Sequence, residues 1–258
     1  MIKILGDFHI HTDFSDGKGS IEAVCREANR VGLEKFAICD HSYRSYFVGM
    51  TDEKLEKSIS RIKQINEKSN SSIDEMKNKK CITALQSVEG NILNFDGDID
   101  VMPSVIKKLD VLHVGFHRFV TKGDGKDRAA FILRNGWTKN LSSELVEKNT
   151  EAFVKAVEKY PVDVICHLGH RAKVNGKRIF ECTKSNGCHI ELNEKHIETL
   201  EPMIDEALKS GVKFILGSDA HKIINVGKFF RVKAFIEKHK IPLERIVGVD
   251  CEFTTRKK

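Results

Sequence analysis

The sequence lacks the features that would place the chain in a membrane or an oxidising compartment. It has no run of about 18 apolar residues, so no transmembrane helix is expected. In the N-terminal stretch MIKILGDFHIH, the apolar run before Gly6 and Asp7 is too short for a signal peptide. The 7 cysteines include no C-x-x-C pair, which favours reduced thiols over disulfides. We therefore expect a cytoplasmic protein with no membrane partner.

Two signatures of nucleotide and nucleic-acid binding are also missing. The stretch GKGS at 17–20 lacks the G-x-G-x-x-G spacing of a phosphate-binding loop, which argues against an open doubly wound sheet. The net charge of +6 suits an anionic substrate. However, no continuous Lys/Arg block is interleaved with aromatic residues, so a nucleic-acid partner is compatible with the charge but not favoured.

Apolar runs alternate with amphipathic helical segments along the whole chain. The apolar runs predict strands at 2–5, leading into DFHIH (7–11), and at 35–41, 81–92, 110–117, 162–170, 188–193, 212–221 and, shorter, 245–249. The helical patterns cover 20–32, 51–70, 143–160, 198–211 and 225–240. This alternation predicts a parallel sheet, and 258 residues is a usual size for a closed (β/α) barrel. With no internal repeat or linker, we expect one domain over 1–258.

Histidines and carboxylates gather at the ends of these predicted strands. The residues concerned are His9, His11, His41, Glu89, His117, His167, Asp219 and His221. A single histidine there could be an ordinary polar residue, but a barrel brings the carboxyl ends of all its strands to one mouth. Imidazole and carboxylate ligands suit Zn²⁺, Mn²⁺ or Fe²⁺. Their number exceeds one tetrahedral site, so the sequence predicts two or three ions.

Six motifs, in this order, carry a family resemblance: DFHIHTDFSDG, FAICDH, SVEGNI, VGFH, ICHLGH and GSDAH. Together they resemble the PHP superfamily, the polymerase and histidinol phosphatase family, from residue 7 to about 250. The wording of VEGNILNFDGDID and DVLHVGFH is most similar to stand-alone bacterial PHP phosphatases. The resemblance implies a distorted seven-stranded TIM-like (β/α) barrel with a trinuclear metal centre at its C-terminal mouth.

The resemblance also implies how the ligands are shared. One ion would be held by His9, His11, Glu89 and Asp219; Glu89 would bridge to a second ion held by His117 and His167; the third would be held by Asp16, His41 and His221. Asp13 lies close to Asp16 in the same loop and is the alternative to it.

Other polar residues receive supporting roles or none. Asp7 and Asp40 are expected to orient the rings of His9 and His41. His113 lies deeper on the strand of His117 and is expected to be a core histidine. Histidines at 189, 196 and 239 are given no role.

Basic residues in loops after the strands are candidates for binding a substrate phosphate. They are Arg44, Arg118, Arg171 and His170. The long segment 118–142, which contains Trp137, is expected to shape substrate specificity.

The expected reaction is hydrolysis of a small phosphomonoester, as in histidinol phosphatases, by a metal-bound hydroxide and without a covalent nucleophile. Three alternatives remain: a nuclease or phosphodiesterase, a non-catalytic metal-binding accessory protein, and an amidohydrolase. The Asp-His of the second strand and the Glu of the third disfavour the amidohydrolase. The natural substrate, the physiological metal and the oligomeric state are left open.

Overall fold

The computed structural model of the chain describes residues 2–45, 48–75, 82–118, 120, 131, 135, 142–249 and 253, with backbone only at 70–75. Eight parallel strands, hydrogen-bonded in chain order, form a nearly closed barrel within this part of the chain. They are β1 (Gly6–Ile10), β2 (Lys35–His41), β3 (Thr83–Asn91), β4 (Val111–Gly115), β5 (Val164–Ile165), β6 (His189–Asn193), β7 (Phe214–Gly217) and β8 (Ile246–Val247).

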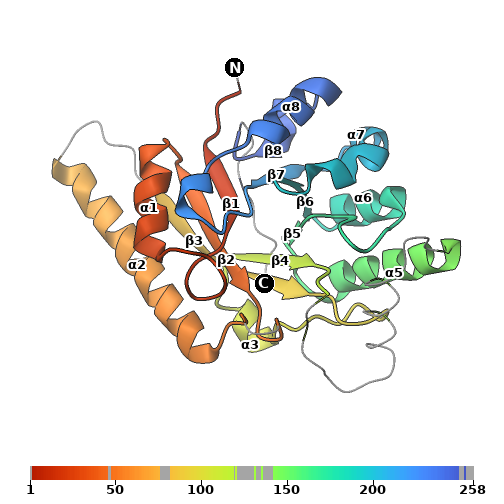
Figure 1. Cartoon of the computed structure of the whole chain (residues 1–258), viewed down its shortest axis with the longest axis horizontal. Coiled ribbons are helices and arrows are strands. Elements are labelled where there is room, and N and C mark those ends of the chain that lie inside the picture. Colours follow the sequence, from red (N-terminus) through yellow and green to blue (C-terminus); the bar gives the residue numbers. More distant parts are fainter. Residues whose placement is uncertain are drawn as a thin grey trace.

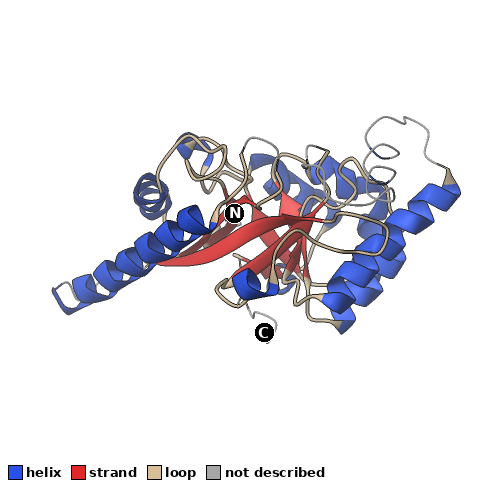
Figure 2. Cartoon of the chain, turned by 90° about the horizontal axis from the view of Figure 1, so that it is seen from below, coloured by secondary structure: helices blue, strands red, loops and turns tan. Residues whose placement is uncertain are grey.

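Helices cover the barrel on both sides. They are α1 (Ile21–Arg30), α2 (Asp52–Glu75), α3 (Pro103–Ile106), α5 (Ser143–Lys159), α6 (Gly176–Ser185), α7 (Ile204–Ser210) and α8 (Phe230–His239). Figure 1 shows α1 and α2 on one side of the strands and α5 to α8 on the other. Figure 2 shows the strands enclosed between these two groups. None of the helices in the described ranges has the length and apolar character needed to cross a membrane.

Two helices begin and end where the sequence predicts. Ser20 caps α1, its hydroxyl accepting a hydrogen bond from the Ala23 backbone N–H at 3.3 Å. Ser142 caps α5 in the same way through Leu145 N–H at 3.2 Å. The residues that α1 buries, Ile21, Val24 and Ala28, recur with helical spacing.

The barrel has eight strands rather than seven, because a short last strand lies between β7 and β1. This strand occupies only one end of the junction between them. β8 pairs with the first residues of β7, and the Gly248 carbonyl accepts from Leu5 N–H at 2.7 Å, next to the start of β1. At the other end, His11 N–H donates directly to the Ala220 carbonyl at 3.0 Å, beyond the end of β7. The mouth is therefore closed by β1 and β7, as in a seven-stranded barrel.

Some predicted elements differ from the structure. Helix α6 has no predicted counterpart, and the predicted helix at 198–211 is a 3₁₀ segment (Ile197–Met203) followed by α7. Pro202 lies inside the 3₁₀ segment and lacks the N–H that a regular helix needs. The predicted helix at 225–240 starts only at Phe230.

Candidate metal centre

The Glu89 side chain lies at the centre of a buried histidine cluster at the mouth of the barrel. It is 1% exposed, and one carboxylate oxygen lies 2.7 Å from His167 Nε2 and 3.0 Å from His117 Nε2. The other oxygen lies 2.9 Å from His41 Nδ1, on the neighbouring strand in register. Burial raises the pKa of Glu89, but the surrounding imidazoles outweigh it and hold the pKa well below its usual range. This carboxylate is therefore ionised at neutral pH.

His9 on β1 and His11, which directly follows this strand, lie close to Asp219 from the far end of the chain. His9 Nε2 lies 3.1 Å from His11 Nε2, and His11 Nε2 lies 3.5 Å from Asp219 Oδ1. Burial, together with the neighbouring His41 and His9, lowers the pKa of His11 to about 3. Its ring is therefore neutral and has a lone pair free for a cation.

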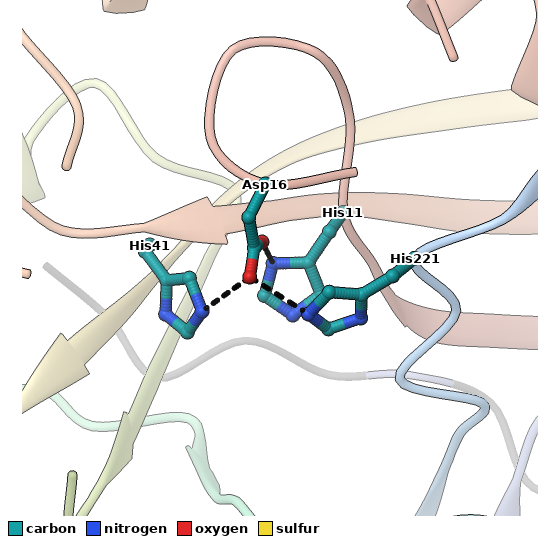
Figure 3. Close-up of side chains that lie close together, drawn as sticks. All are labelled: His11, Asp16, His41 and His221. Carbon is teal, nitrogen blue, oxygen red and sulfur yellow. Dashed lines mark ion pairs between the residues drawn. The ribbon is translucent and has the colours of Figure 1, made fainter. Parts of the chain in front are cut away.

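Asp16, rather than Asp13, reaches the histidine cluster from the loop after β1. Figure 3 shows its carboxylate between the rings of His11, His41 and His221. One oxygen lies 3.1 Å from His221 Nε2 and 3.6 Å from His41 Nε2, whereas Asp13 is exposed. The sequence left open which of the two loop aspartates lies near the histidines, and in the structure it is Asp16.

The Asp16 loop turns tightly and depends on a glycine. Gly17 N–H donates to the Thr12 carbonyl at 2.9 Å, and a Cβ at Gly17 would lie only 2.3 Å from the His11 carbonyl oxygen. A side chain there would open the turn and move Asp16 away from the histidines.

Two of the predicted ligands have left-handed backbone conformations. The φ angles are +32° at His167 and +53° at Asp219. Non-glycine residues in this region cost on the order of 1–3 kcal/mol and persist where the surrounding structure fixes them, often at functional sites.

The residues present fit divalent metal ions. Their ligand atoms form overlapping groups in which every atom lies within 4.8 Å of the others: His11, Asp16, His41 and His221; His9, His11 and Asp219; His41, Glu89 and His117; Glu89, Cys166 and His167; and His9, Cys39 and His113. The Nε2 atoms of His9 and His11 are buried and face each other. This arrangement of two polar atoms is favourable when both nitrogens coordinate a cation. All the predicted metal ligands are thus brought together.

Asp7 and Asp40 differ from the roles that the sequence predicts. Asp7 accepts from the backbone N–H groups of Ser218 at 3.0 Å and Gly227 at 2.9 Å, and its contact with His9 is to the backbone N–H at 3.4 Å. It joins β1 to the segment after β7 rather than orienting the imidazole.

Asp40 holds the loop that carries Asp16. It accepts from Thr12 N–H at 2.7 Å, from the Thr12 hydroxyl at 2.6 Å and from the Ser15 hydroxyl. Its hydrogen bonds therefore go to this loop and not to the His41 ring.

Glu191 performs the orienting role and was not predicted. Its carboxylate lies 2.7 Å from His9 Nδ1 and accepts from the His167 backbone N–H at 2.7 Å. A Cβ at Gly217 would lie 1.9 Å from its Oε1, so the glycine of β7 makes room for it. One feature of the sequence could have pointed to Glu191: the predicted strand at 188–193 had been given no candidate residue for the metal site.

Two further residues fix polar atoms of the site. Asn91 Oδ1 lies 2.6 Å from His117 Nδ1, and with the proton on that nitrogen His117 Nε2 would offer its lone pair to a cation bound beside Glu89. Lys195 Nζ lies 2.9 Å from Asp219 Oδ1 and 2.7 Å from His221 Nδ1, with its side chain 39% exposed. An ammonium group therefore stands at the edge of the site.

His113 is buried, as expected, but lies close to the site. Its Nδ1 is 2.7 Å from the Ser87 hydroxyl, and its ring centre is 5.3 Å from that of His9. On β4 it pairs in register with Glu89 of β3.

The predicted phosphate-binding residues differ in how exposed they are. Arg44 and Arg171 are exposed, and Arg118 is partly buried. Arg171 Nε donates to His170 Nε2 at 3.2 Å, and His170 stacks on His196 at 3.8 Å between ring centres. Most of segment 118–142, including Trp137, lies outside the described residues, so its effect on specificity stays a prediction.

Comparison with known proteins establishes the family. A PHP domain model matches residues 7–203. The chain belongs to the PHP domain family. This PHP chain is 24% identical to a probable phosphatase of Acetivibrio thermocellus, covering 97% of this chain and 93% of that protein. It is 27% identical to a probable phosphatase of Caldanaerobacter subterraneus subsp. tengcongensis, covering 97% and 89%.

The fold of the PHP chain is similar to that of a histidinol phosphate phosphatase from Lactococcus lactis subsp. lactis. That structure is a complex with zinc, L-histidinol and phosphate. The TM-score is 0.59 at 13% sequence identity, and the match covers 98% of this chain and 99% of that chain. The predicted family and the predicted TIM-like barrel are thus confirmed.

Proposed function

We propose that this PHP chain, a metal-dependent phosphatase, hydrolyses a small phosphomonoester at a centre of two or three divalent transition-metal ions. The proposed ligands are His9, His11, Asp16, His41, Glu89, His117, His167, Asp219 and His221. The observation that carries the proposal is the buried Glu89 carboxylate, whose two oxygens face histidines from β2 and from the segments after β4 and β5. We also propose that residues 1–258 form one PHP domain.

The residues of the chain would divide the work around a phosphate. Divalent ions bound here would lower the pKa of water and neutralise charge that develops on the phosphoryl group. Asn91 and Glu191 hold the His117 and His9 rings in place. The ammonium of Lys195 and the guanidinium of Arg118 supply positive charge at the mouth for the remaining phosphate oxygens.

Two observations favour a small monoester. The similar fold from Lactococcus lactis binds L-histidinol and phosphate. In this chain the residues that would hold the cations lie at the mouth of the barrel and are mostly buried, which suits a terminal phosphate inserted end-on. A zinc ion in the similar structure supports a transition metal here.

The test combines metal counting with three substrates. The purified protein is analysed for metals, stripped with a chelator, reloaded with Mn²⁺ or Zn²⁺ and assayed on p-nitrophenyl phosphate, histidinol phosphate and bis-p-nitrophenyl phosphate. We expect two or three ions per chain and hydrolysis of the monoesters that chelation abolishes. Hydrolysis of the diester alone would instead indicate a phosphodiesterase. Full metal content without any hydrolysis would indicate an accessory protein.

A further inference from the structure

The Cys166 thiol lies against the carboxylate at the centre of the site. Its Sγ donates to Glu89 Oε1 at 3.4 Å, and the same oxygen lies 2.7 Å from His167 Nε2. Cys166 is 1% exposed and His167 is 5% exposed. The thiol, the imidazole and the carboxylate each offer a ligand atom within 4.8 Å of the other two.

The backbone is bent so that two consecutive residues face the same carboxylate. In a regular strand Cys166 and His167 would point to opposite faces. The φ angle of +32° at His167 breaks this alternation at the end of β5. Both side chains consequently reach Glu89.

The end of β4 leaves space for both side chains. A Cβ at Gly115 would lie 2.6 Å from Cys166 Sγ and 2.7 Å from His167 Cε1. Any other residue at this position would displace the thiol or the ring. His167 Nε2, the ring nitrogen that faces Glu89, is the atom that would bind an ion there.

We propose that Cys166 supplies a thiolate ligand to the divalent ion held by Glu89 and His167. The Sγ–Oε1 distance of 3.4 Å is close to the spacing of two ligand atoms around one tetrahedral ion. The sulfur–metal bond forms as the thiol proton leaves to solvent, so no oxidant or reductant is needed. The inference rests on the proposed metal centre but not on the identity of its substrate.

A thiolate ligand would change which metals bind. Soft sulfur ligands favour Zn²⁺ and other thiophilic ions over Mn²⁺ and Mg²⁺, which prefer oxygen. The position at Glu89, His167 and Cys166 would then select zinc, whereas the position at His11, Asp16, His41 and His221 has only imidazole and carboxylate ligands.

Cobalt substitution tests the thiolate ligand without an activity assay. Co²⁺ is titrated into the metal-free full chain, and the near-ultraviolet spectrum is followed for a thiolate-to-cobalt charge-transfer band. We expect the band in the wild type and its loss in Cys166→Ser, with the visible cobalt bands retained in both. Cys188→Ser is the matched control, since Cys188 is equally buried but its thiol contacts the His189 carbonyl. It should keep the band.

The outcomes separate this inference from the proposed function. Bound cobalt without a charge-transfer band, or a band that survives in Cys166→Ser, would overturn the thiolate ligand and leave the metal centre intact. No bound cobalt would overturn both. Should Cys166→Ser fail to fold, zinc K-edge absorption on the wild type decides: a sulfur at about 2.3 Å supports the ligand, and only nitrogen and oxygen neighbours at about 2.0–2.2 Å overturn it.

Discussion

Replacement of Glu89 by glutamine removes the central charge of the site and changes almost no volume. The carboxylate lies 2.7 Å from His167 Nε2, 3.0 Å from His117 Nε2 and 2.9 Å from His41 Nδ1. Loss of a residue that merely orients a ligand costs about 10- to 100-fold in metal affinity or activity. A residue that contacts the ions themselves should exceed this range. We therefore expect kcat/KM to fall at least about 100-fold, equivalent to about 2.7 kcal/mol.

The assay measures p-nitrophenyl phosphate hydrolysis and metal content for the wild type and Glu89→Gln at equal amounts of folded protein. Asp163→Asn is the matched control, because Asp163 is a buried carboxylate that precedes β5 and accepts from Leu112 N–H, at the opposite end of the strands. We expect it to keep metal content and rate. A folded Glu89→Gln protein with the full complement of ions and a near wild-type rate would refute the central role of Glu89.

Three more predictions test neighbouring features. Asp16→Asn should lower kcat/KM by about 10-fold or more while Asp13→Asn leaves it unchanged, because only Asp16 reaches the histidines; equal effects in steady-state assays would contradict this. Lys195→Met should raise KM for a phosphomonoester by about 10-fold, with partial recovery in Lys195→Arg, and an unchanged KM would exclude its contact with the phosphate. Burial lowers the pKa of His113 from 6.5 to about 3, so below pH 6.5 the unfolded chain binds a proton that the folded chain does not, and stability is lost as the pH falls. The free energy of unfolding is measured by urea unfolding of the metal-free protein at pH 7 and pH 5. His113→Asn should reduce the loss of stability by up to about 1.4 kcal/mol per pH unit. If the free energy of unfolding of the wild type and of the variant has the same dependence on pH, His113 is not buried in its neutral form.

The sequence was sufficient for the barrel and for the convergence of the ligands. His9 and His221 are separated by most of the chain, yet each follows an apolar run, and a parallel barrel delivers such ends to one mouth. The apolar run at 245–249 also predicted the eighth strand, although β8 has only two residues and pairs only with the first residues of β7.

The contacts around the ligands could not be predicted from strand spacing. Glu191 reads as one polar residue in an apolar strand, and its contact with His9 depends on the space left by Gly217. Asp7 and Asp40 adjoin ligands in the sequence, but their carboxylates bind backbone and hydroxyl groups of the surrounding loops. Period-two alternation would also point Cys166 away from the face that His167 uses, which the backbone at His167 reverses.

The most direct test of the metal centre is anomalous diffraction from crystals loaded with Zn²⁺ or Mn²⁺, with data collected at the absorption edge of each metal. We predict two or three peaks at the mouth of the barrel, of which at least one lies about 2.0–2.2 Å from a Glu89 oxygen. Peaks confined to other surfaces of the protein, with none at coordination distance from Glu89, His117 or His167, would contradict the account.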